Sequence, residues 1–282
     1  DPDFTGFDDP VGAVDYSYRI GSFEVTNDQY AEFLNAVAAQ DNNALYDTNM
    51  DTSAEGGITR SGESPTFSYA VKPDMGAKPV IYVNWYDALR FCNWLHNGQP
   101  SGAQDATTTE GGAYTLTGAT SVAAGDDPTH GANGRNVGAR FWLPGEDEWY
   151  KAAYHEPGAS TNSYWLYPTR SDSAPTPATA DVFGNIANDT VNIANCQSGA
   201  DWNGQDGNVT TVGSGGLGSA SYYGAFDMGG NVFEWNEELI GGDRGMRGGR
   251  WSTGSDFLRS SDSARSNPSS ENRSIGFRVA GP

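Results

Sequence analysis

The sequence predicts a loop-rich α+β protein with few, short helices and strands. Glycine accounts for 37 of the 282 residues, about 13% against a usual ~7%. Helical spacing of apolar residues occurs in a few short segments, which are separated by long stretches of Asn, Asp, Gly, Ser and Thr. The apolar share is only 37%, but 8 Trp, 14 Tyr and 12 Phe supply enough bulk for a folded core.

The N-terminal part predicts an extended arm, a short strand and then a helix. We expect residues 1–15 to form the arm, and polar and apolar side chains alternate over residues 16–20, as in a strand. Thr26 and Gln29 have the spacing of a capping box, which marks the start of a helix. An apolar face follows at helical spacing, formed by Tyr30, Phe33, Leu34 and Val37.

Two further helices are predicted in the middle of the chain. Residues 79–83 are a continuous apolar run typical of a buried strand, and Asn84 is a suitable cap for the helix after them, which ends at Asn97-Gly98. Another helix begins after Gly145, where acidic residues in the first turn suit the helix dipole.

The remaining segments predict loops and short strands. A strand at residues 113–117 interrupts the loop 99–138, and residues 156–225 have almost no helical periodicity. Short strands are expected around Trp235 and in residues 247–251 and 275–279. Because no linker or repeat divides the chain, we predict one domain over residues 16–282 after the arm at 1–15.

Charge and cysteine content exclude several classes of function. With 16 basic and 36 acidic side chains the net charge is −20, which argues against nucleic acids and anionic membranes as partners and favours divalent cations. No apolar stretch approaches the ~20 residues of a membrane span. Two cysteines and three scattered histidines provide neither a disulfide framework nor zinc-ligand spacing. Whether Cys92 and Cys196 pair stays open.

Six segments in order carry a family resemblance that covers roughly residues 16–280. They are Phe23-Glu-Val-Thr-Asn-Asp-Gln-Tyr-Ala-Glu-Phe-Leu-Asn35, Lys78-Pro-Val-Ile-Tyr-Val-Asn-Trp-Tyr-Asp-Ala-Leu89, Arg140-Phe-Trp-Leu-Pro-Gly-Glu-Asp-Glu-Trp149, Asp227-Met-Gly-Gly-Asn-Val-Phe-Glu-Trp235, Arg247-Gly-Gly-Arg-Trp251 and Ile275-Gly-Phe-Arg-Val-Ala280. Together they resemble the formylglycine-generating enzyme, or sulfatase-modifying factor, domain superfamily, and especially its secreted bacterial members. The resemblance implies a C-type-lectin-like fold and an extracellular or cell-surface location.

The resemblance also indicates a protein that is not an enzyme. Oxidases of this superfamily bind copper with two cysteines, whose positions correspond here to Thr253 and Leu258. Neither side chain can form a thiolate, so neither can bind Cu(I). An oxygen- or metal-dependent oxidoreductase that uses other residues is the rival hypothesis.

Calcium is the one cofactor that the resemblance implies. A first site carries over onto the Asp227 and Glu234 carboxylates and the Gly230 and Val232 carbonyls, a mixture of oxygens that suits calcium. A second, less secure set is Asn195, the Cys196 carbonyl, Asp206 and Asn208. A solvated turn explains this second set equally well.

Other features predict interactions at the surface. Residues 252–273 flank the family's active-site position and are small and polar, so they can bind glycans or another ligand, although a plain solvated loop is an equal reading. Three sequons give candidate N-glycosylation sites at Asn188, Asn208 and Asn272. The extended arm can add to a neighbour's sheet and build a homopolymer, although packing on its own domain is commoner.

Taken together, these observations predict a secreted, non-catalytic, calcium-stabilised structural or recognition protein. It can serve as a self-assembling extracellular fibre subunit. The alternatives are a glycan- or ligand-binding lectin-like module and the oxidoreductase named above.

Overall fold

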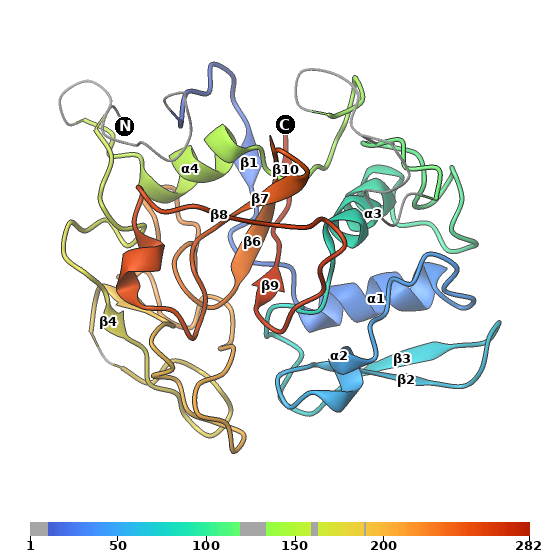
Figure 1. Ribbon diagram of the computed structural model, residues 1–282, viewed down its shortest axis with the longest axis horizontal. Helices are drawn as coiled ribbons and strands as arrows, with labels where there is room; N and C mark the ends of the chain where they lie inside the picture. The colour runs from blue at the N-terminus through green and yellow to red at the C-terminus, as the bar shows by residue number, and fades with distance from the viewer. Residues whose placement is uncertain (1–10, 119–133, 159–162, 189) are drawn as a thin grey trace.

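A four-stranded sheet forms the centre of the computed structural model, which describes residues 11–118, 134–158, 163–188 and 190–282. Its strand order is β8 (Ala264–Ser266), β7 (Asp243–Arg247), β6 (Phe233–Ile240) and β9 (Ile275–Gly276), with β6 and β9 parallel. Figure 1 shows this sheet between α4 on one side and α1 and α3 on the other. The segment before α1 and the end of the chain meet where β1 (Arg19–Ile20) pairs with β10 (Ala280–Gly281).

The three predicted helices are confirmed, and each begins where the sequence predicted. In α1 (Asn27–Val37), Thr26 and Gln29 form the capping box. In α3 (Trp85–His96), the Asp87 amide donates to Asn84 Oδ1 at 3.1 Å. The third helix is α4 (Glu146–Tyr154). Helices α1 and α3 pack through Phe33, whose ring centroid lies 5.4 Å from that of Phe91.

Two predicted strands are absent at their positions, and of a third, predicted at residues 247–251, only Arg247 lies in a strand. Residues 79–83 are buried, but Pro79 makes only an isolated bridge to Thr26, and Tyr82 has a φ of 61° that an extended strand does not allow. At residues 113–117 the Asn93 side chain takes the place of a neighbouring strand. Its Oδ1 accepts from the Tyr114 amide at 2.8 Å, and its Nδ2 donates to the Tyr114 carbonyl at 3.1 Å.

Several short elements lie in segments where the sequence predicted loops. They are the helix α2 (Asn49–Thr52), the hairpin of β2 (Ile58–Ser61) and β3 (Ser68–Val71), the parallel pair β4 (Thr176–Pro177) and β5 (Ile193–Ala194), and the 3₁₀ helix η2 (Ser255–Leu258). The overall expectation of a loop-rich α+β fold is confirmed.

Buried ion pairs join the sequence segments that carry the family resemblance. Glu234 of β6 pairs with Arg278 at 2.6 Å, and neither side chain is exposed. Glu146, at the start of α4, pairs with Arg247 of β7. Buried charges need partners, so these pairs fix how the segments sit on one another.

The described part of the arm packs on its own domain. The Gly12 amide donates to Asp147 Oδ1 at 2.6 Å, and Lys151 Nζ donates to the Val14 carbonyl at 2.8 Å. Residues 1–10 of the predicted arm lie outside the described residues. In the described ranges, no helix is both long and apolar enough to span a membrane. Cys92 and Cys196 are both buried free thiols.

Candidate functional site

Residues 252–273, which we term the exposed segment, are held in place through the backbone. The Gln197 amide donates to the Thr253 carbonyl at 2.8 Å, the Ser260 amide donates to the Leu166 carbonyl at 2.9 Å, and the Trp85 amide donates to the Pro268 carbonyl at 2.9 Å. Bonds of this kind do not depend on which side chains the segment carries. Its path is therefore fixed by the rest of the domain.

Two side chains from outside the segment add to this support. Arg247 donates through Nη1 to the Ser260 carbonyl at 3.0 Å and also to the Asp262 carbonyl. The Tyr154 hydroxyl donates to the Leu258 carbonyl at 3.1 Å. Because Arg247 and Tyr154 are both fully buried, the framework beneath the exposed segment is rigid.

The side chains of the exposed segment divide into a few buried anchors and many solvent-facing groups. Leu258 and Ser260 are buried, whereas Phe257 is 48% exposed. The other solvent-facing side chains are polar and include Asp256, Arg259, Ser261, Arg265, Asn267, Ser269, Asn272 and Arg273. This arrangement presents varied polar chemistry and one aromatic ring on a fixed backbone.

The family's cysteine positions, Thr253 and Leu258, lie around one glycine in the structure. A Cβ added to Gly249 would lie 2.7 Å from Leu258 Cδ1 and 3.2 Å from Thr253 Oγ1. Thr253 Oγ1 accepts from the Arg250 amide at 3.0 Å and donates to the Arg250 carbonyl at 3.0 Å. Both side chains thus have structural contacts, in a turn and in an apolar cluster.

Arg273 connects the exposed segment to Glu55 and Trp251. Its Nη1 lies 3.1 Å from Glu55 Oε1, and its guanidinium lies 5.1 Å from the centroid of the Trp251 ring. Nearby, Glu271 Oε1 accepts from Asn84 Nδ2 at 3.0 Å. Burial, together with the neighbouring Asp47 carboxylate, raises the pKa of Glu271 to about 7.

Glu271 should make stability fall as the pH rises. Its raised pKa means that the folded state keeps a proton that the unfolded state loses between about pH 4.5 and 7, so the free energy of unfolding declines through that window. Glu271→Gln should remove on the order of 1 kcal/mol of that decline, an estimate reduced because the group is partly solvated. Urea unfolding of both proteins from pH 4 to 8 measures the difference. Parallel stability profiles would contradict the raised pKa.

The first predicted calcium set lies in a buried cluster of charges. Both Glu234 oxygens accept from Arg278 at 2.6 Å, and Glu234 Oε2 also accepts from Trp149 Nε1 at 2.7 Å. Asp227 Oδ2 accepts from the Gly213 amide at 2.5 Å, and burial raises the pKa of Asp227 to about 6. Gly230 has a φ of 85° and packs against the Asn195 backbone, and Val232 is fully buried.

Glu24 joins this cluster, which the sequence did not indicate. Its Oε1 accepts from Asn231 Nδ2 at 3.0 Å, across 207 residues, and its Oε2 is buried with no partner among the described residues. Burial, then Asp227 and Glu234, raise the pKa of Glu24 well above its ordinary value. Three acidic groups, those of Glu24, Asp227 and Glu234, therefore lie near the Arg278 guanidinium. Only its position beside the predicted helix start could have drawn attention to Glu24.

The second predicted set is brought together only in part. Asn195 Nδ2 donates to the Asn208 carbonyl at 2.8 Å, and Asn195 Oδ1 is buried with no partner among the described residues. Asp206 is exposed, and the Cys196 carbonyl accepts from the Gly199 amide at 3.2 Å. The two sets adjoin, because the Asn231 amide donates to the Asn195 carbonyl at 2.8 Å.

The three sequons differ in accessibility. Asn208 is fully buried. Asn188 is half-buried, and its Oδ1 accepts from the Thr179 hydroxyl at 3.0 Å. Asn272 belongs to the exposed segment, and its side chain faces solvent. A glycan on the folded protein therefore fits at Asn272 and not at Asn208.

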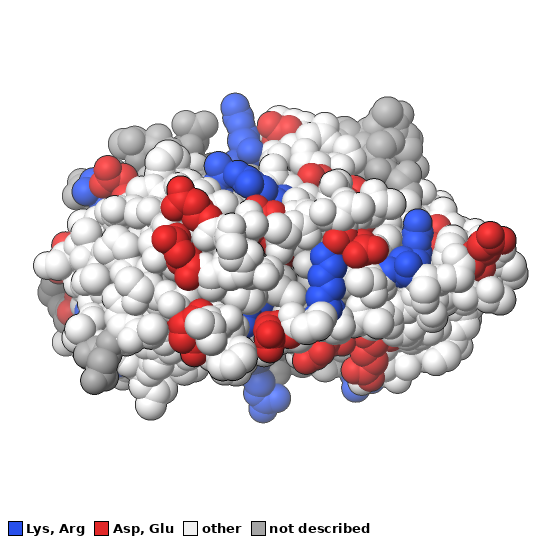
Figure 2. All heavy atoms as spheres, turned by 90° about the horizontal axis from the view of Figure 1, so that it is seen from below, with Lys and Arg blue, Asp and Glu red and all other residues white. Residues whose placement is uncertain are grey.

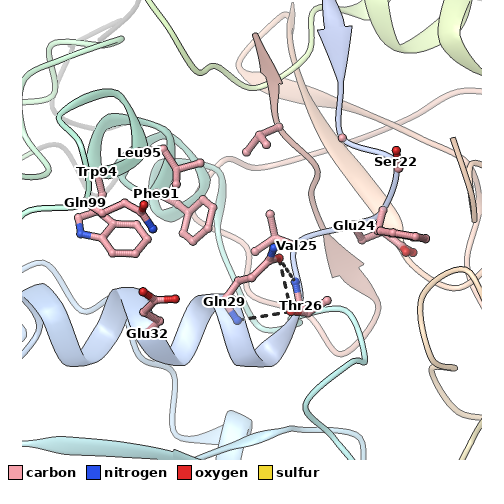
Figure 3. Close-up of a pocket in the computed structure, with 13 residues that line it drawn as sticks. Ser22, Glu24, Val25, Thr26, Gln29, Glu32, Phe91, Trp94, Leu95 and Gln99 are labelled. Carbon is pink, nitrogen blue, oxygen red and sulfur yellow. Dashed lines mark hydrogen bonds between the residues drawn. The ribbon is translucent and has the colours of Figure 1, made fainter.

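A groove of about 310 Å³ lies between α1, α3 and residues 21–26 (Figure 3). Phe91 and Trp94 form its base and belong to the core. Gln29 belongs to the first turn of α1, and its side-chain oxygen accepts from the Thr26 amide at 3.0 Å. Figure 2 shows that, on the face seen from below Figure 1, acidic and basic side chains are interspersed among uncharged ones.

The family assignment rests on a match along nearly the whole chain. Residues 10–281 match the model of the sulfatase-modifying factor enzyme 1-like domain. The chain belongs to this family. The predicted resemblance and its C-type-lectin-like fold are thereby confirmed.

A solved structure supports the same fold. The crystal structure of CarF superimposes with a TM-score of 0.52 at 21% identity, over 94% of this chain and 86% of that one. Treponema denticola variable protein 1 gives a TM-score of 0.49 at 19% identity, over 96% and 90%. PvdO from Pseudomonas aeruginosa gives 0.42 at 15% identity, over 94% and 80%. The likeness to CarF concerns the fold alone.

One curated relative matches over a short stretch. The serine/threonine-protein kinase pkn1 of Chlamydia caviae is 36% identical over 81 residues, which are 22% of this chain and 13% of the relative. This chain thus spans only a small part of that protein. The kinase activity in the relative's name is said of that protein alone.

Proposed function

We propose that the protein is a secreted, non-catalytic recognition module whose ligand binds to the exposed segment, residues 252–273. The observation that carries this proposal is that the backbone and the side chains of that segment have different roles. Its backbone is bonded to the framework, while side chains such as Asp256, Phe257 and Arg265 face solvent. Recognition residues on loops that a rigid scaffold positions are typical of binding proteins.

The chemistry at the family's catalytic positions supports a role without catalysis. Thr253 serves a turn and Leu258 an apolar cluster, and neither can provide the thiolate that copper needs. A copper-dependent oxidase would therefore need ligands at other positions.

Glycans are the ligand class that the exposed side chains suit best. Carboxylate, amide, hydroxyl and guanidinium groups can exchange hydrogen bonds with sugar hydroxyls, and the exposed Phe257 ring offers an apolar face for a sugar ring. The described residues 11–15 pack on their own α4, which favours recognition over fibre assembly. Self-assembly through residues 1–15 stays a prediction.

A glycan array tests this proposal with two matched variants. The surface variant replaces Asp256, Phe257, Arg259 and Arg265 with alanine. The control variant replaces Glu63, Phe183, Arg140 and Arg170, which are also exposed, so it removes the same kinds of side chain from elsewhere. We expect the wild type and the control to bind the same glycans and the surface variant to lose them at least tenfold. Equal binding of neutral glycans by all three proteins, or no binding of neutral glycans by the wild type, would contradict the proposal.

We further propose that calcium stabilises the fold. Asn195 Oδ1, buried without a partner among the described residues, fits a calcium ligand, and Asn208 lies beside it. At the first set Asp227 fits, whereas Glu234 is taken up by Arg278. Within the described ranges, no group of three Asp, Glu, His or Cys side chains is arranged to hold a metal ion. The ion would neutralise the excess acid around Arg278 and tie residues 195–208 to residues 227–234.

Calcium should raise the unfolding temperature. At 100 times its dissociation constant a ligand contributes about 2.7 kcal/mol, which corresponds to roughly 5–10 °C for a domain of this size. Thermal unfolding with calcium, with magnesium and with chelator measures the effect. Asn195→Ala should reduce the shift. Identical unfolding temperatures in calcium and chelator would refute the calcium proposal.

A further inference from the structure

A second pocket lies far along the sequence from the exposed segment, between β1 and α4. It has a volume of about 460 Å³, within the range of small-molecule sites. The side chains that matter for its chemistry are Tyr16, Ser17, Tyr18, Arg19, Lys151 and Tyr223. Neither the family's catalytic positions nor the predicted calcium residues take part in it.

Two cations, Arg19 and Lys151, line this pocket. Most arginines of this chain are in ion pairs, for example Arg135 with Glu148 and Arg273 with Glu55. In the part of the chain that the structure describes, neither Arg19 nor Lys151 has a carboxylate within ion-pair distance. Both face the same pocket in a chain of net charge −20, so the pocket is a local site for an anion.

The aromatic walls of the pocket are fixed before any ligand arrives. The Tyr16 hydroxyl donates to Glu148 Oε1 at 2.9 Å, and the Tyr18 hydroxyl donates to the Glu148 carbonyl at 2.6 Å. The Tyr223 hydroxyl lies 2.6 Å from His155 Nδ1, and the two rings stack at 5.9 Å. Because these contacts hold the ring orientations, binding costs little side-chain entropy.

Two neighbouring carboxylates, those of Glu148 and Asp147, are already engaged. Glu148 forms an ion pair with Arg135 at 2.6 Å, and Asp147 Oδ1 accepts from the Gly12 amide. Tyr16 and Tyr223 are about half exposed, at 45% and 51%. A ligand can therefore reach ring surfaces, two cations and the Ser17 hydroxyl at once.

We propose that this pocket binds an acidic saccharide, that is, a sugar that carries a carboxylate. The carboxylate would form ion pairs with Arg19 and Lys151. The sugar ring would pack on Tyr16 and Tyr223, and the Ser17 hydroxyl would form a hydrogen bond with a sugar hydroxyl. A simple inorganic anion would use the cations and leave the aromatic surfaces unused. This site is separate from the exposed segment and does not depend on it.

Calorimetric titration of the full chain with digalacturonate tests the proposal. The controls are its neutral methyl ester and inorganic phosphate. Wild type should bind digalacturonate at least tenfold more tightly than either control. Arg19→Gln and Tyr223→Ala should each weaken binding at least fivefold, because both side chains lie on the surface and each supplies a different part of the site.

Arg170→Gln is the matched control, since Arg170 is an exposed arginine that belongs neither to the exposed segment nor to this pocket. It should leave digalacturonate binding within twofold of wild type. The proposal is overturned if wild type does not bind digalacturonate, if phosphate or the ester binds equally well, or if Arg19→Gln has no effect. A loss caused by Arg265→Gln alone would overturn it as well, and would support sugar binding at the exposed segment instead.

Discussion

Replacing Arg278 with methionine should destabilise the protein by about 3–5 kcal/mol, because it leaves a buried carboxylate without its counter-charge. Arg278 binds both oxygens of Glu234 and also donates to the Gly21 and Phe226 carbonyls, each at 2.9 Å. It therefore joins three segments that are far apart in the sequence. Two further acids, Glu24 and Asp227, lie close enough to raise the cost of its loss.

Urea unfolding of the Arg278→Met variant measures this effect. Arg265→Gln is the control, because the Arg265–Asp243 pair is exposed and 3.8 Å long and should contribute less than about 0.5 kcal/mol. Should the methionine variant fail to fold, Arg278→Lys keeps the charge and gives a measurable intermediate. A loss below about 1 kcal/mol for Arg278→Met would show that the buried pair does not hold the cluster together.

Arg247→Met should have a comparable cost, about 3–5 kcal/mol, and a second, local consequence. Glu146 would lose its partner, and the Ser260 and Asp262 carbonyls would lose their donor. The exposed segment should therefore loosen in addition to the global destabilisation. Hydrogen exchange of the amides in residues 252–273 should become faster than the change in global stability alone explains.

Arg90→Met provides the matched control for that local effect. Arg90 is also fully buried, and its ion-pair partner at 2.6 Å is Glu110, which lies outside the exposed segment. It should lower global stability without selective loss of protection in residues 252–273. Equal exchange patterns in the two variants would contradict the anchoring role of Arg247.

Local signals in the sequence predicted the helices well. The capping residues Thr26 and Asn84 bond to groups only three residues away, so their geometry is encoded in neighbouring residues. The short strands predicted around Trp235 and at residues 275–279 lie near β6 and β9, whereas the strand predicted at 247–251 is wrong, because β7 ends at Arg247. The ordered family segments then predicted the fold that their arrangement shows.

Contacts between distant residues decided what the sequence did not predict. The strand expected at 113–117 is replaced by bonds to the Asn93 side chain, and Tyr82 turns the apolar run at 79–83 into a loop. Glu24 meets Asn231 across 207 residues. No periodicity or local spacing reports such pairs, since an amide or a carboxylate can bond to any segment that the fold brings near.

The exposed segment shows the same limit at the candidate site. The sequence indicated a polar surface at residues 252–273, but a solvated loop explained it equally well. The backbone bonds from Gln197, Ser260 and Trp85 distinguish a fixed surface from a loose loop. The partners outside the segment, Gln197, Leu166 and Trp85, come from three separate parts of the chain.

The central claim is that the solvent-facing side chains of the exposed segment serve recognition, whereas its backbone and buried anchors stabilise the fold. The most direct test is to measure the free energy of unfolding and the glycan binding of the surface variant of Asp256, Phe257, Arg259 and Arg265 together. The account predicts a stability within about 1 kcal/mol of wild type and a loss of binding. A large loss of stability, or retained binding on an intact fold, would contradict it.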